Sequence, residues 1–350
     1  MRAVTAPALT EEQEQAVLRR SEPLLLSAGA GSGKTSVLVE RFVRAVLEDG
    51  VAAGRILAIT FTDRAAGELR ERVRSRFLAL GEREAARDTE AAFVSTFHGF
   101  CARLLRTHPL LAGLDPDFAV LDEGLAGALR ERAFASALGG FLAADRAEAV
   151  DLLAAYGVDQ ARAMIAGAYA ELRSRGQRFP RLPVPAADGD RDPLGVAAAS
   201  ACGLLDELLA GFSHAYEALK QGRGAVDFDD LELCARELLD DRESVREAWA
   251  QRFELLMVDE FQDTNPRQLG ILRALDRGNL FTVGDELQSI YGFRHADVGL
   301  FRARRRELAE TGASLALTHN FRSRGPLLNV VNAVVRERLG ADFTPLVAGR

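Results

Sequence analysis

The feature that most constrains the fold of this chain is the glycine-rich octapeptide AGAGSGKT at residues 28–35. It follows the apolar run 24–27 and opens an amphipathic stretch that extends from Thr35 to about Leu47. A glycine-rich turn between a strand and a helix directs backbone N–H groups and the positive end of the helix towards an anion. Lys34 is placed to reach the β- and γ-phosphates of a nucleotide, and the Thr35 hydroxyl to ligate Mg²⁺. The alternative is a turn that caps a helix and binds nothing.

Short apolar runs alternate with amphipathic stretches at both ends of the chain. The runs 56–60 and 92–95 follow the phosphate loop, with a helix expected between about Ala65 and Leu80. Strand-like runs return at 255–258, 280–283 and 315–317. Strands alternating with helices predict an α/β fold, a parallel sheet with helices on both faces.

The middle of the chain has a different pattern. From about residue 107 to residue 223 it reads as helices rich in Ala, Leu and Arg, with one proline-rich loop expected at 179–196. The sequence therefore predicts one α/β domain with a helical domain inserted into it.

An acidic motif, residues 258–263 with the sequence VDEFQD, follows the apolar run 255–258. A carboxylate at the end of such a strand can hold Mg²⁺ through water, and Asp259 fits that role. Glu260 is then placed to accept a proton from an attacking water. A solvated turn is the alternative for an acidic pair by itself, and the phosphate loop argues against it. Lys34 and Asp259 are 225 residues apart, which an inserted domain explains.

Composition limits the compartment and the partner. Three widely spaced cysteines exclude a disulfide framework or a cysteine-rich zinc site and favour a reducing cytoplasm. We find no N-terminal signal peptide and no apolar run close to the roughly 18–20 residues of a membrane span, so a membrane is not an expected partner. The formal charge of −7 argues at first against nucleic acid, but residues 107–301 carry −14 while the two ends carry +2 and +5.

In order along the chain, the motifs resemble those of the UvrD/Rep-like superfamily 1 DNA helicases. The resemblance spans about residues 9–332, and a stretch within residues 106–123 is closer to the AddA/RecB branch of recombinational-repair helicase–nucleases. The matching segments are 9–17 (Q motif), 28–35 (motif I), 60–66 (motif Ia), 95–101 (a DNA-contact motif), 228–231, 259–263 (motif II), 283–294 (motif III) and 320–323 (motif IV).

The resemblance implies a RecA-like domain 1A at 1–106 plus 226–300, an all-helical domain 1B at 107–225, and the incomplete start of a RecA-like domain 2A at 301–350. It implies an ATP- and Mg²⁺-dependent helicase that moves 3′→5′ on single-stranded or duplex-end DNA in repair or recombination. The AddA/RecB branch adds a second helicase–nuclease subunit as an expected partner. The alternative is a truncated ATP- and DNA-binding module that lacks motor activity without a partner or the missing C-terminal half. A P-loop GTPase or a small-molecule kinase fits neither Gln13 nor the VDEFQD motif.

The resemblance also assigns roles at the ATP site. Gln13 would read adenine, Phe321 would stack on it, Gln288 would sense the γ-phosphate, and Arg322 would act as an arginine finger. Ser36 stands where relatives often carry Arg, so one adenine contact is expected to be missing. The nucleotide-site residues implied are Gln13, Ala28, Gly29, Ala30, Gly31, Ser32, Gly33, Lys34, Thr35, Ser36 and Phe321.

For the DNA strand, the resemblance implies aromatic base pockets and polar contacts. The residues are Phe61, Thr62, Thr96, His98, Tyr291, Phe293 and Arg294. Phe61 by itself would more often be a core residue, and His98 a structural histidine. The acidic cluster Asp227, Asp229 and Asp230 is interpreted as a helix N-terminus rather than a metal site.

Overall fold

A computed structural model describes residues 9–143, 146–185, 193–292, 295–339 and 343–349 of the chain. The chain divides into two compact units, one formed by residues 1–100 with 239–350 and the other by residues 101–238. The second unit is the insertion that the sequence predicts, and its boundaries lie six residues earlier and thirteen later than the expected 107–225.

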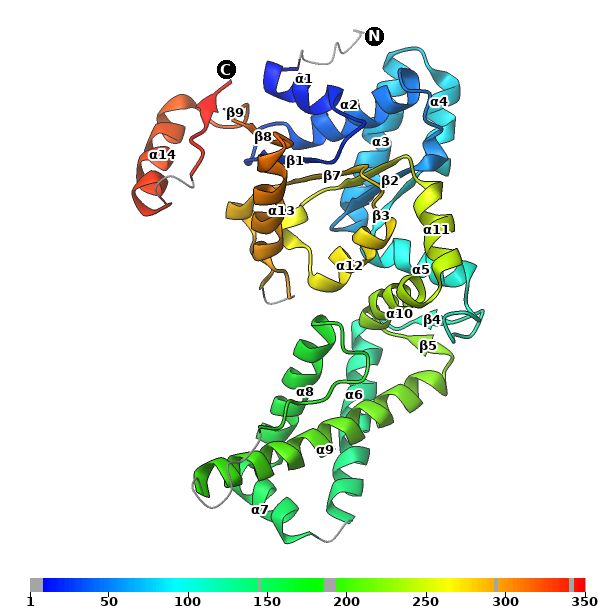
Figure 1. Ribbon diagram of the computed structural model, residues 1–350, viewed down its shortest axis with the longest axis vertical. Helices are drawn as coiled ribbons and strands as arrows, with labels where there is room; N and C mark the ends of the chain where they lie inside the picture. The colour runs from blue at the N-terminus through cyan, green and yellow to red at the C-terminus, as the bar shows by residue number, and fades with distance from the viewer. Residues whose placement is uncertain (1–8, 144–145, 186–192, 293–294, 340–342, 350) are drawn as a thin grey trace. The chain divides into compact units, whose positions relative to one another are not determined.

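The first unit is built on a six-stranded parallel sheet with the strand order β3-β2-β6-β7-β1-β8 (Figure 1). The apolar runs found in the sequence form these strands. All of them except β8, in which three of four residues are only partly buried, are buried along most of their length, as expected for a parallel sheet covered on both faces. The strands are β1 (Leu24–Ala28), β2 (Ile56–Thr60), β3 (Phe93–Thr96), β6 (Leu255–Val258), β7 (Leu280–Gly284) and β8 (Ser314–Leu317).

The sheet order separates the two strands that carry the phosphate loop and the acidic motif. β7 lies between β1 and β6, with Leu26 opposite Val283 on one side and Val258 opposite Thr282 on the other. The two strands that carry the motifs are therefore not neighbours in the sheet. Because all six strands are parallel, both motifs still end at the same edge of the sheet, where ligands bind in open α/β sheets.

The helices of the first unit connect these strands. The chain enters at α1 (Glu11–Leu18), and the predicted helices after β1 and β2 form as α2 (Lys34–Leu47) and α3 (Asp63–Ala79). The other helices are α4 (Arg83–Asp88), α5 (Phe97–Thr107, which runs into the second unit), α11 (Glu243–Arg252), α12 (Pro266–Leu275), α13 (Val298–Glu310) and α14 (Gly325–Leu339).

The segment 301–350 does not begin a separate unit in this structure. Helix α13 crosses residue 301, and β8 pairs in parallel with β1, Leu26 opposite Leu315, so this strand completes the first sheet. The physical reason is that β8 buries the outer edge of β1, which would otherwise expose its unpaired backbone groups.

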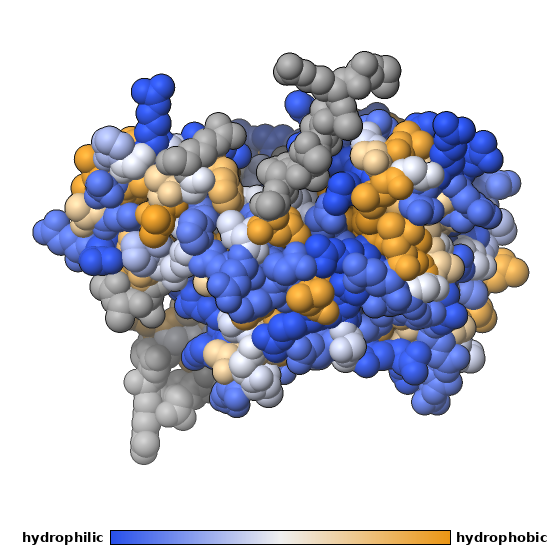
Figure 2. All heavy atoms as spheres, turned by 90° about the horizontal axis from the view of Figure 1, so that it is seen from above, coloured by the Kyte–Doolittle hydropathy of each residue, from blue (hydrophilic) through white to orange (hydrophobic). Residues whose placement is uncertain are grey.

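Beyond β8, the short strands β9 (His319–Asn320) and β10 (Val347–Ala348) pair in parallel, and α14 lies between them in sequence. Helix α14 leaves several apolar side chains exposed: Leu327, Val330, Val331 and Val334. Figure 2, viewed from the side on which this helix lies, shows apolar patches among mostly hydrophilic side chains.

The second unit is a bundle in which α6 and α9 pack along one another (Figure 1). Its core is formed by apolar residues from these helices and from α8, including Leu129, Ile165, Leu208 and Phe212. Its helices are α6 (Glu123–Ala143), α7 (Ala147–Tyr156), α8 (Val158–Ser174), α9 (Pro193–Gln221) and α10 (Phe228–Asp241).

Two details of the second unit differ from the expectation. It is not entirely helical, because β4 (Ala119–Val120) and β5 (Ala225–Val226) form a short parallel pair. The predicted loop at 179–196 is too long at its C-terminal end, because α9 begins at Pro193. Proline is well tolerated in the first turn of a helix, where its missing N–H group has no intrahelical partner anyway. Residues 186–192 of this loop lie outside the described residues.

Helix α9 is also long and apolar enough, by length and composition over Leu194–Gln221, to cross a membrane, the one such case in the described part of the chain. The expectation that no apolar run approaches this length is therefore wrong. Its alanines raise the hydropathy, while Leu208, Leu209 and Phe212 are buried in the core of the second unit. Length and composition alone are weak evidence for a membrane span.

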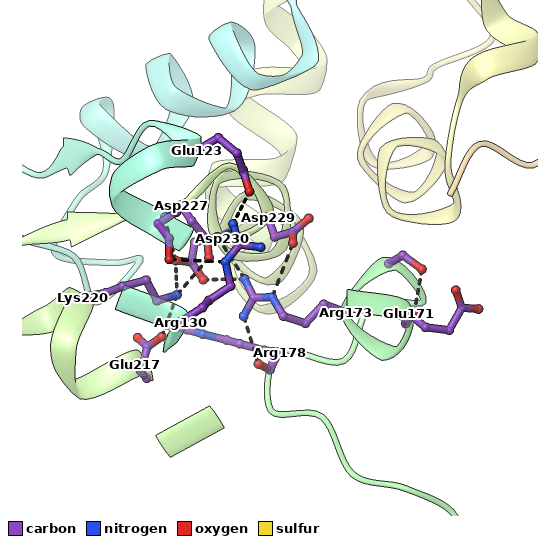
Figure 3. A network of polar contacts seen from close by, with 12 residues as sticks. Glu123, Arg130, Glu171, Arg173, Arg178, Glu217, Lys220, Asp227, Asp229 and Asp230 are labelled. Atoms are coloured by element: carbon purple, nitrogen blue, oxygen red, sulfur yellow. Dashed lines mark hydrogen bonds and ion pairs between the residues drawn. The ribbon is translucent and has the colours of Figure 1, made fainter. Parts of the chain in front are cut away.

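A buried ion network joins α8, α9 and the start of α10 (Figure 3). The Arg173 guanidinium contacts Asp230 at 2.6 Å and Asp227 at 3.4 Å, and the Lys220 ammonium hydrogen-bonds Asp230 and lies 3.6 Å from Asp227. Arg173 and Lys220 are both 1% exposed. The Asp230 carboxylate also accepts the Asp227 N–H at 2.9 Å, and the Asp227 carboxylate accepts the Asp230 N–H at 2.8 Å. This reciprocal pair caps α10 as a capping box does. The acidic cluster is thus a helix N-terminus, as interpreted, with two buried cations added.

Candidate active site

A cavity of about 700 Å³ opens at the phosphate loop of the first unit. Its volume lies within the range of small-molecule sites. It brings together residues from the Q motif, the phosphate loop, α2, α3 and motif IV: Leu9, Gln13, Gly29, Gly31, Gly33, Lys34, Thr35, Ser36, Val39, Glu40, Glu71, Arg72, Ser75, Arg76, Ala79, Phe321 and Arg322.

Two glycines of the loop are required by its geometry. Gly31 and Gly33 have φ angles of 76° and 91°, in the left-handed region that favours glycine. A Cβ atom on Gly33 would lie 2.5 Å from the Gln13 amide nitrogen, and one on Gly31 would lie 2.6 Å from the Arg322 Cβ. The glycines therefore allow the Q motif and motif IV to approach the loop backbone closely.

Gln13 is fixed at the entrance of α1 by a capping box. The Thr10 hydroxyl accepts the Gln13 N–H at 3.2 Å, and the Gln13 side-chain oxygen accepts the Thr10 N–H at 3.0 Å. The Gln13 amide nitrogen donates to the Ser32 carbonyl at 2.8 Å. The Q motif is thus bonded directly to the phosphate loop, and the amide keeps one N–H and one lone pair for a ligand.

Lys34 meets the acidic motif across the sheet. Its ammonium contacts the Glu260 carboxylate at 3.0 Å, although the two residues are 226 positions apart. Both side chains are largely shielded, with 12% and 35% of their surface exposed. This pair brings the cation expected to bind phosphate and the carboxylate expected to accept a proton to the same point.

Glu260 is held in an unusual backbone conformation. Its φ of 49° and ψ of 44° place a non-glycine residue in the left-handed region, at a cost of about 1–3 kcal/mol. Its carboxylate also accepts a hydrogen bond from the Gln262 amide at 2.9 Å, and its N–H donates to Asp259 at 2.9 Å. Strain of this kind at a residue with several polar contacts indicates a position selected for function rather than for local stability.

The two aspartates of the motif are poorly solvated. Burial, with the neighbouring Glu260 charge as the second cause, raises the pKa of Asp259 and that of Asp263 to about 6 each. Hard oxygen donors are the ligands that Mg²⁺ prefers, so the Asp259 carboxylate and the Thr35 hydroxyl suit this ion chemically. Among the described residues, no group of three or more His, Cys, Asp or Glu residues forms a ready-made metal site.

Motif III is joined to the acidic motif through side-chain amides. Gln262 accepts the Asp285 N–H at 2.9 Å, and the Gln288 amide donates to the Asp285 carboxylate at 2.5 Å. Gly284 is needed here, because a Cβ on it would lie 2.3 Å from the Gln262 side-chain oxygen. Asp259, Glu260 and Gln288 therefore form a connected group beside the cavity rather than part of its lining.

Motif IV is tied to the phosphate loop by a residue that the sequence did not single out. The Asn320 amide donates to the Ala30 carbonyl at 2.6 Å, and its oxygen accepts the Arg322 and Ser323 N–H groups at 2.9 and 2.7 Å. The Phe321 N–H donates to the Gly31 carbonyl at 2.8 Å. Phe321 and Arg322 are thereby held at the cavity, Arg322 with its side chain exposed.

The aromatic residues of motifs Ia and III lie against each other. The Phe61 and Tyr291 rings stack with centroids 4.7 Å apart and planes inclined by 28°. Both residues are only partly buried, so Phe61 is not the core residue that it would be if judged by itself. Leu287 and Ile290, in motif III, are 51% and 69% exposed. An accessible stacked pair of this kind suits the binding of bases.

The other predicted strand contacts are less uniform. Thr62 is exposed and caps α3 by accepting the Ala65 N–H at 3.1 Å. Thr96 is buried, accepts the Gly99 N–H at 3.1 Å and donates to Asp63 at 3.2 Å, which are structural roles. His98 is partly exposed. Phe293 and Arg294 lie outside the described residues.

Comparison with known proteins agrees with this arrangement. The family described as "UvrD/REP helicase N-terminal domain" matches residues 9–309. The chain belongs to this family. It is 33% identical over 345 residues to "ATP-dependent DNA helicase UvrD1" of Mycobacterium tuberculosis, covering 95% of this chain and 40% of that protein. It is 30% identical over 334 residues to "ATP-dependent DNA helicase PcrA" of Staphylococcus aureus, covering 94% and 40%. The chain thus spans about 40% of the length of these relatives.

Membership of the UvrD/REP family confirms the resemblance and the RecA-like α/β fold. The closer likeness to the AddA/RecB branch stays a prediction, as does a helicase–nuclease partner. The domain assignments and the roles of the individual site residues likewise stay predictions.

A second residue that sequence reasoning missed is Glu12. Its carboxylate accepts the Thr318 N–H at 2.9 Å and the Thr318 hydroxyl, and it lies 3.3 Å from the His319 ring. Burial alone would raise the pKa of Glu12, but the hydrogen bonds from Thr318 and His319 outweigh it and lower the pKa. The signal in the sequence was weak, because Glu12 is one of three acidic residues in the first turn of α1.

Glu12→Ala is expected to destabilise the chain by about 1–3 kcal/mol, because the Thr318 N–H and hydroxyl lose a charged acceptor. Since the pKa of Glu12 is lowered from its ordinary value of 4.5, its contribution is present above that pH and is lost as the pH falls below it. Urea unfolding at pH 7 and at pH 4 measures both effects. Glu11→Ala, an exposed neighbour, is the control, and an equal loss in the two variants would contradict the assignment.

Proposed function

We propose that this chain binds ATP with Mg²⁺, hydrolyses it, and couples hydrolysis to 3′→5′ movement on single-stranded DNA in DNA repair or recombination. The observation that carries the proposal is the 3.0 Å contact between Glu260 and Lys34, which itself lines a cavity large enough for a nucleotide. The names of the relatives, "ATP-dependent DNA helicase", support the same activity. Movement and strand separation are proposals for the whole protein.

The contact suggests how a nucleotide engages the site. A phosphate at the loop offers Lys34 an anion of higher charge than the Glu260 carboxylate, so the ammonium is expected to move to the phosphate. Glu260 then loses one of its two side-chain hydrogen-bond donors and keeps the Gln262 amide. Both donors contact the Glu260 Oε2 atom, so this oxygen then keeps only the Gln262 amide, and the carboxylate is no longer paired with the ammonium when a water molecule approaches it.

Hydrolysis then needs one proton transfer. A water oxygen attacks the γ-phosphorus as the bond to the bridging oxygen breaks, and ADP leaves with that oxygen. Glu260 takes the proton of the attacking water, which is general-base catalysis. Lys34 neutralises the charge on the phosphate oxygens, and Arg322, exposed at the cavity, is positioned to add a second cation. Bound Mg²⁺, held by Thr35 and Asp259, would supply further charge neutralisation.

Lys34→Ala tests the nucleotide site. Removing the ammonium deletes a charge-assisted contact to phosphate, so ATP affinity is expected to fall by about 10- to 100-fold. Isothermal titration of the chain with ATP and Mg²⁺ measures this. Unchanged affinity would refute the proposed function, because the cavity would then bind ATP without its phosphate cation.

Phe61→Ala tests the strand-binding surface. Loss of one stacking face is expected to weaken binding of single-stranded DNA by about 1–3 kcal/mol, with little dependence on base sequence. Fluorescence anisotropy with a labelled oligothymidylate at fixed salt measures it, since the salt concentration itself changes affinity. Phe77→Leu, in the buried core of the same unit, is the control for a general loss of packing. If Phe61→Ala bound the oligonucleotide as tightly as the unmodified chain, Phe61 would not be part of the strand-binding surface.

A further inference from the structure

The nucleotide cavity extends well beyond the phosphate loop, between two helices. On α2, Ser36, Val39 and Glu40 line it, and their spacing places them on one face of the helix. Glu40 lies six residues beyond Lys34, which corresponds to about 9 Å along the helix axis. If the phosphates occupy the loop, this end of the cavity is where a ribose and base would lie.

An ion pair lines this end of the cavity. The Arg76 Nε atom contacts Glu40 Oε1 at 2.5 Å, and Arg76 Nη2 lies 3.4 Å from Glu40 Oε2. The side chains are 26% and 11% exposed, and both line the cavity. Among the described residues, the Arg76 Nη1 atom makes no hydrogen bond, so one edge of the guanidinium remains available to a ligand.

The pair differs from the other charges on this stretch of α3. Arg72 also lines the cavity but is exposed, and its nearest carboxylate, Glu68, is 3.9 Å away. Arg76 is instead held in place by a two-point contact before any ligand arrives. A pre-positioned group loses less conformational freedom on binding than a mobile one, and so contributes more to affinity.

Resting on the proposed function, we propose that Arg76 contacts the base and ribose of the bound nucleotide and that Glu40 positions it. Ser36, on the facing helix, carries no charge and so supplies no cation to this part of the cavity. Arg76, on α3, supplies the cation at this end of the cavity. Its planar guanidinium binds a base face or a ribose hydroxyl, two groups that are absent from the phosphate part of the nucleotide. Glu40 is a positioning residue, since its carboxylate is occupied by Arg76.

The test compares a ligand that has a base with one that lacks it. The Kd values of ATP and of inorganic tripolyphosphate, each with excess Mg²⁺, are measured by titration calorimetry on the full chain. Arg76→Ala is expected to weaken ATP about tenfold and to change tripolyphosphate by less than about twofold. Glu40→Gln is expected to weaken ATP about threefold, again without affecting tripolyphosphate. The more conservative Glu40→Gln also decides the matter if Arg76→Ala does not fold.

Matched variants separate the possible results. Arg74→Ala, an exposed arginine on the same helix and outside the cavity lining, should leave both ligands unaffected. Lys34→Ala should weaken both. If Arg76→Ala and Glu40→Gln weaken both ligands equally, or neither, the inference is overturned while the proposed function stands. If the unmodified chain binds neither ligand, the proposed function and the inference both fail.

Discussion

Glu260→Gln is expected to bind ATP as tightly as the unmodified chain and to hydrolyse it about 10²–10⁴-fold more slowly. The amide keeps the size and hydrogen-bonding shape of the carboxylate but cannot accept a proton from water. Loss of the Glu260 carboxylate charge also frees Lys34 from its ion pair at 3.0 Å, which favours phosphate binding. Single-turnover hydrolysis and equilibrium ATP binding, measured on the same preparation, separate these two effects.

The control is Glu254→Gln, at the start of the same strand segment, where the carboxylate pairs with Arg55 at 2.8 Å and is 42% exposed. This variant should hydrolyse ATP normally, because Glu254 lies outside the connected group of motifs II and III. Hydrolysis by Glu260→Gln at the unmodified rate would show that another group accepts the proton. A loss of ATP binding in Glu260→Gln would instead show that Glu260 acts by holding the phosphate loop in place.

Lys220→Met is expected to lower the free energy of unfolding by about 3–5 kcal/mol, the largest stability effect we expect of a single substitution in this chain. Lys220 is 1% exposed and contacts Asp230, Asp227 and, at 3.0 Å, Glu217. Burial would lower the pKa of Lys220, but Asp230 and Asp227 outweigh it and raise the pKa. Removing the ammonium leaves these carboxylates buried with less compensating charge.

Urea unfolding followed by circular dichroism measures this loss, and Arg146→Met provides the comparison. Arg146 pairs with Glu207 at 2.6 Å on the surface of the same unit, with 36% and 52% of the two side chains exposed, so its loss should cost only about 0–1 kcal/mol. Similar losses in the two variants would show that the buried carboxylates find other partners or water. In that case the network would matter little for stability.

The nucleotide half of the site could be predicted from the sequence because its signals are local. A strand, a glycine-rich turn and the Lys-Thr pair are adjacent in the chain, so their geometry follows from the backbone they share. The acidic motif was predictable for the same reason, since Asp259 and Glu260 directly follow a run of four apolar residues. The predicted strands coincide with the observed ones to within one residue at either end.

Other features depend on residues that are distant in sequence. Nothing in the local pattern of Glu12 or Asn320 indicates a bond to Thr318 or to the Ala30 carbonyl. Lys220 is a different case, because Asp227 and Asp230 lie only seven and ten residues away, yet its Ala- and Leu-rich helix gave no sign that the three side chains are buried together. The ion pair between Glu40 and Arg76 joins two helices that each read as ordinary amphipathic segments.

The sequence by itself determined the family, the alternation of strands and helices, and which residue types face a phosphate. Only the tertiary structure decided the strand order that places β7 between β1 and β6, the inclusion of β8 in the first sheet, and the contact between Lys34 and Glu260. The physical reason is the separation along the chain over which each effect acts. Propensity, periodicity and turn chemistry act over a few residues, whereas the strand order and the contact between Lys34 and Glu260 depend on how apolar faces pack across more than two hundred positions.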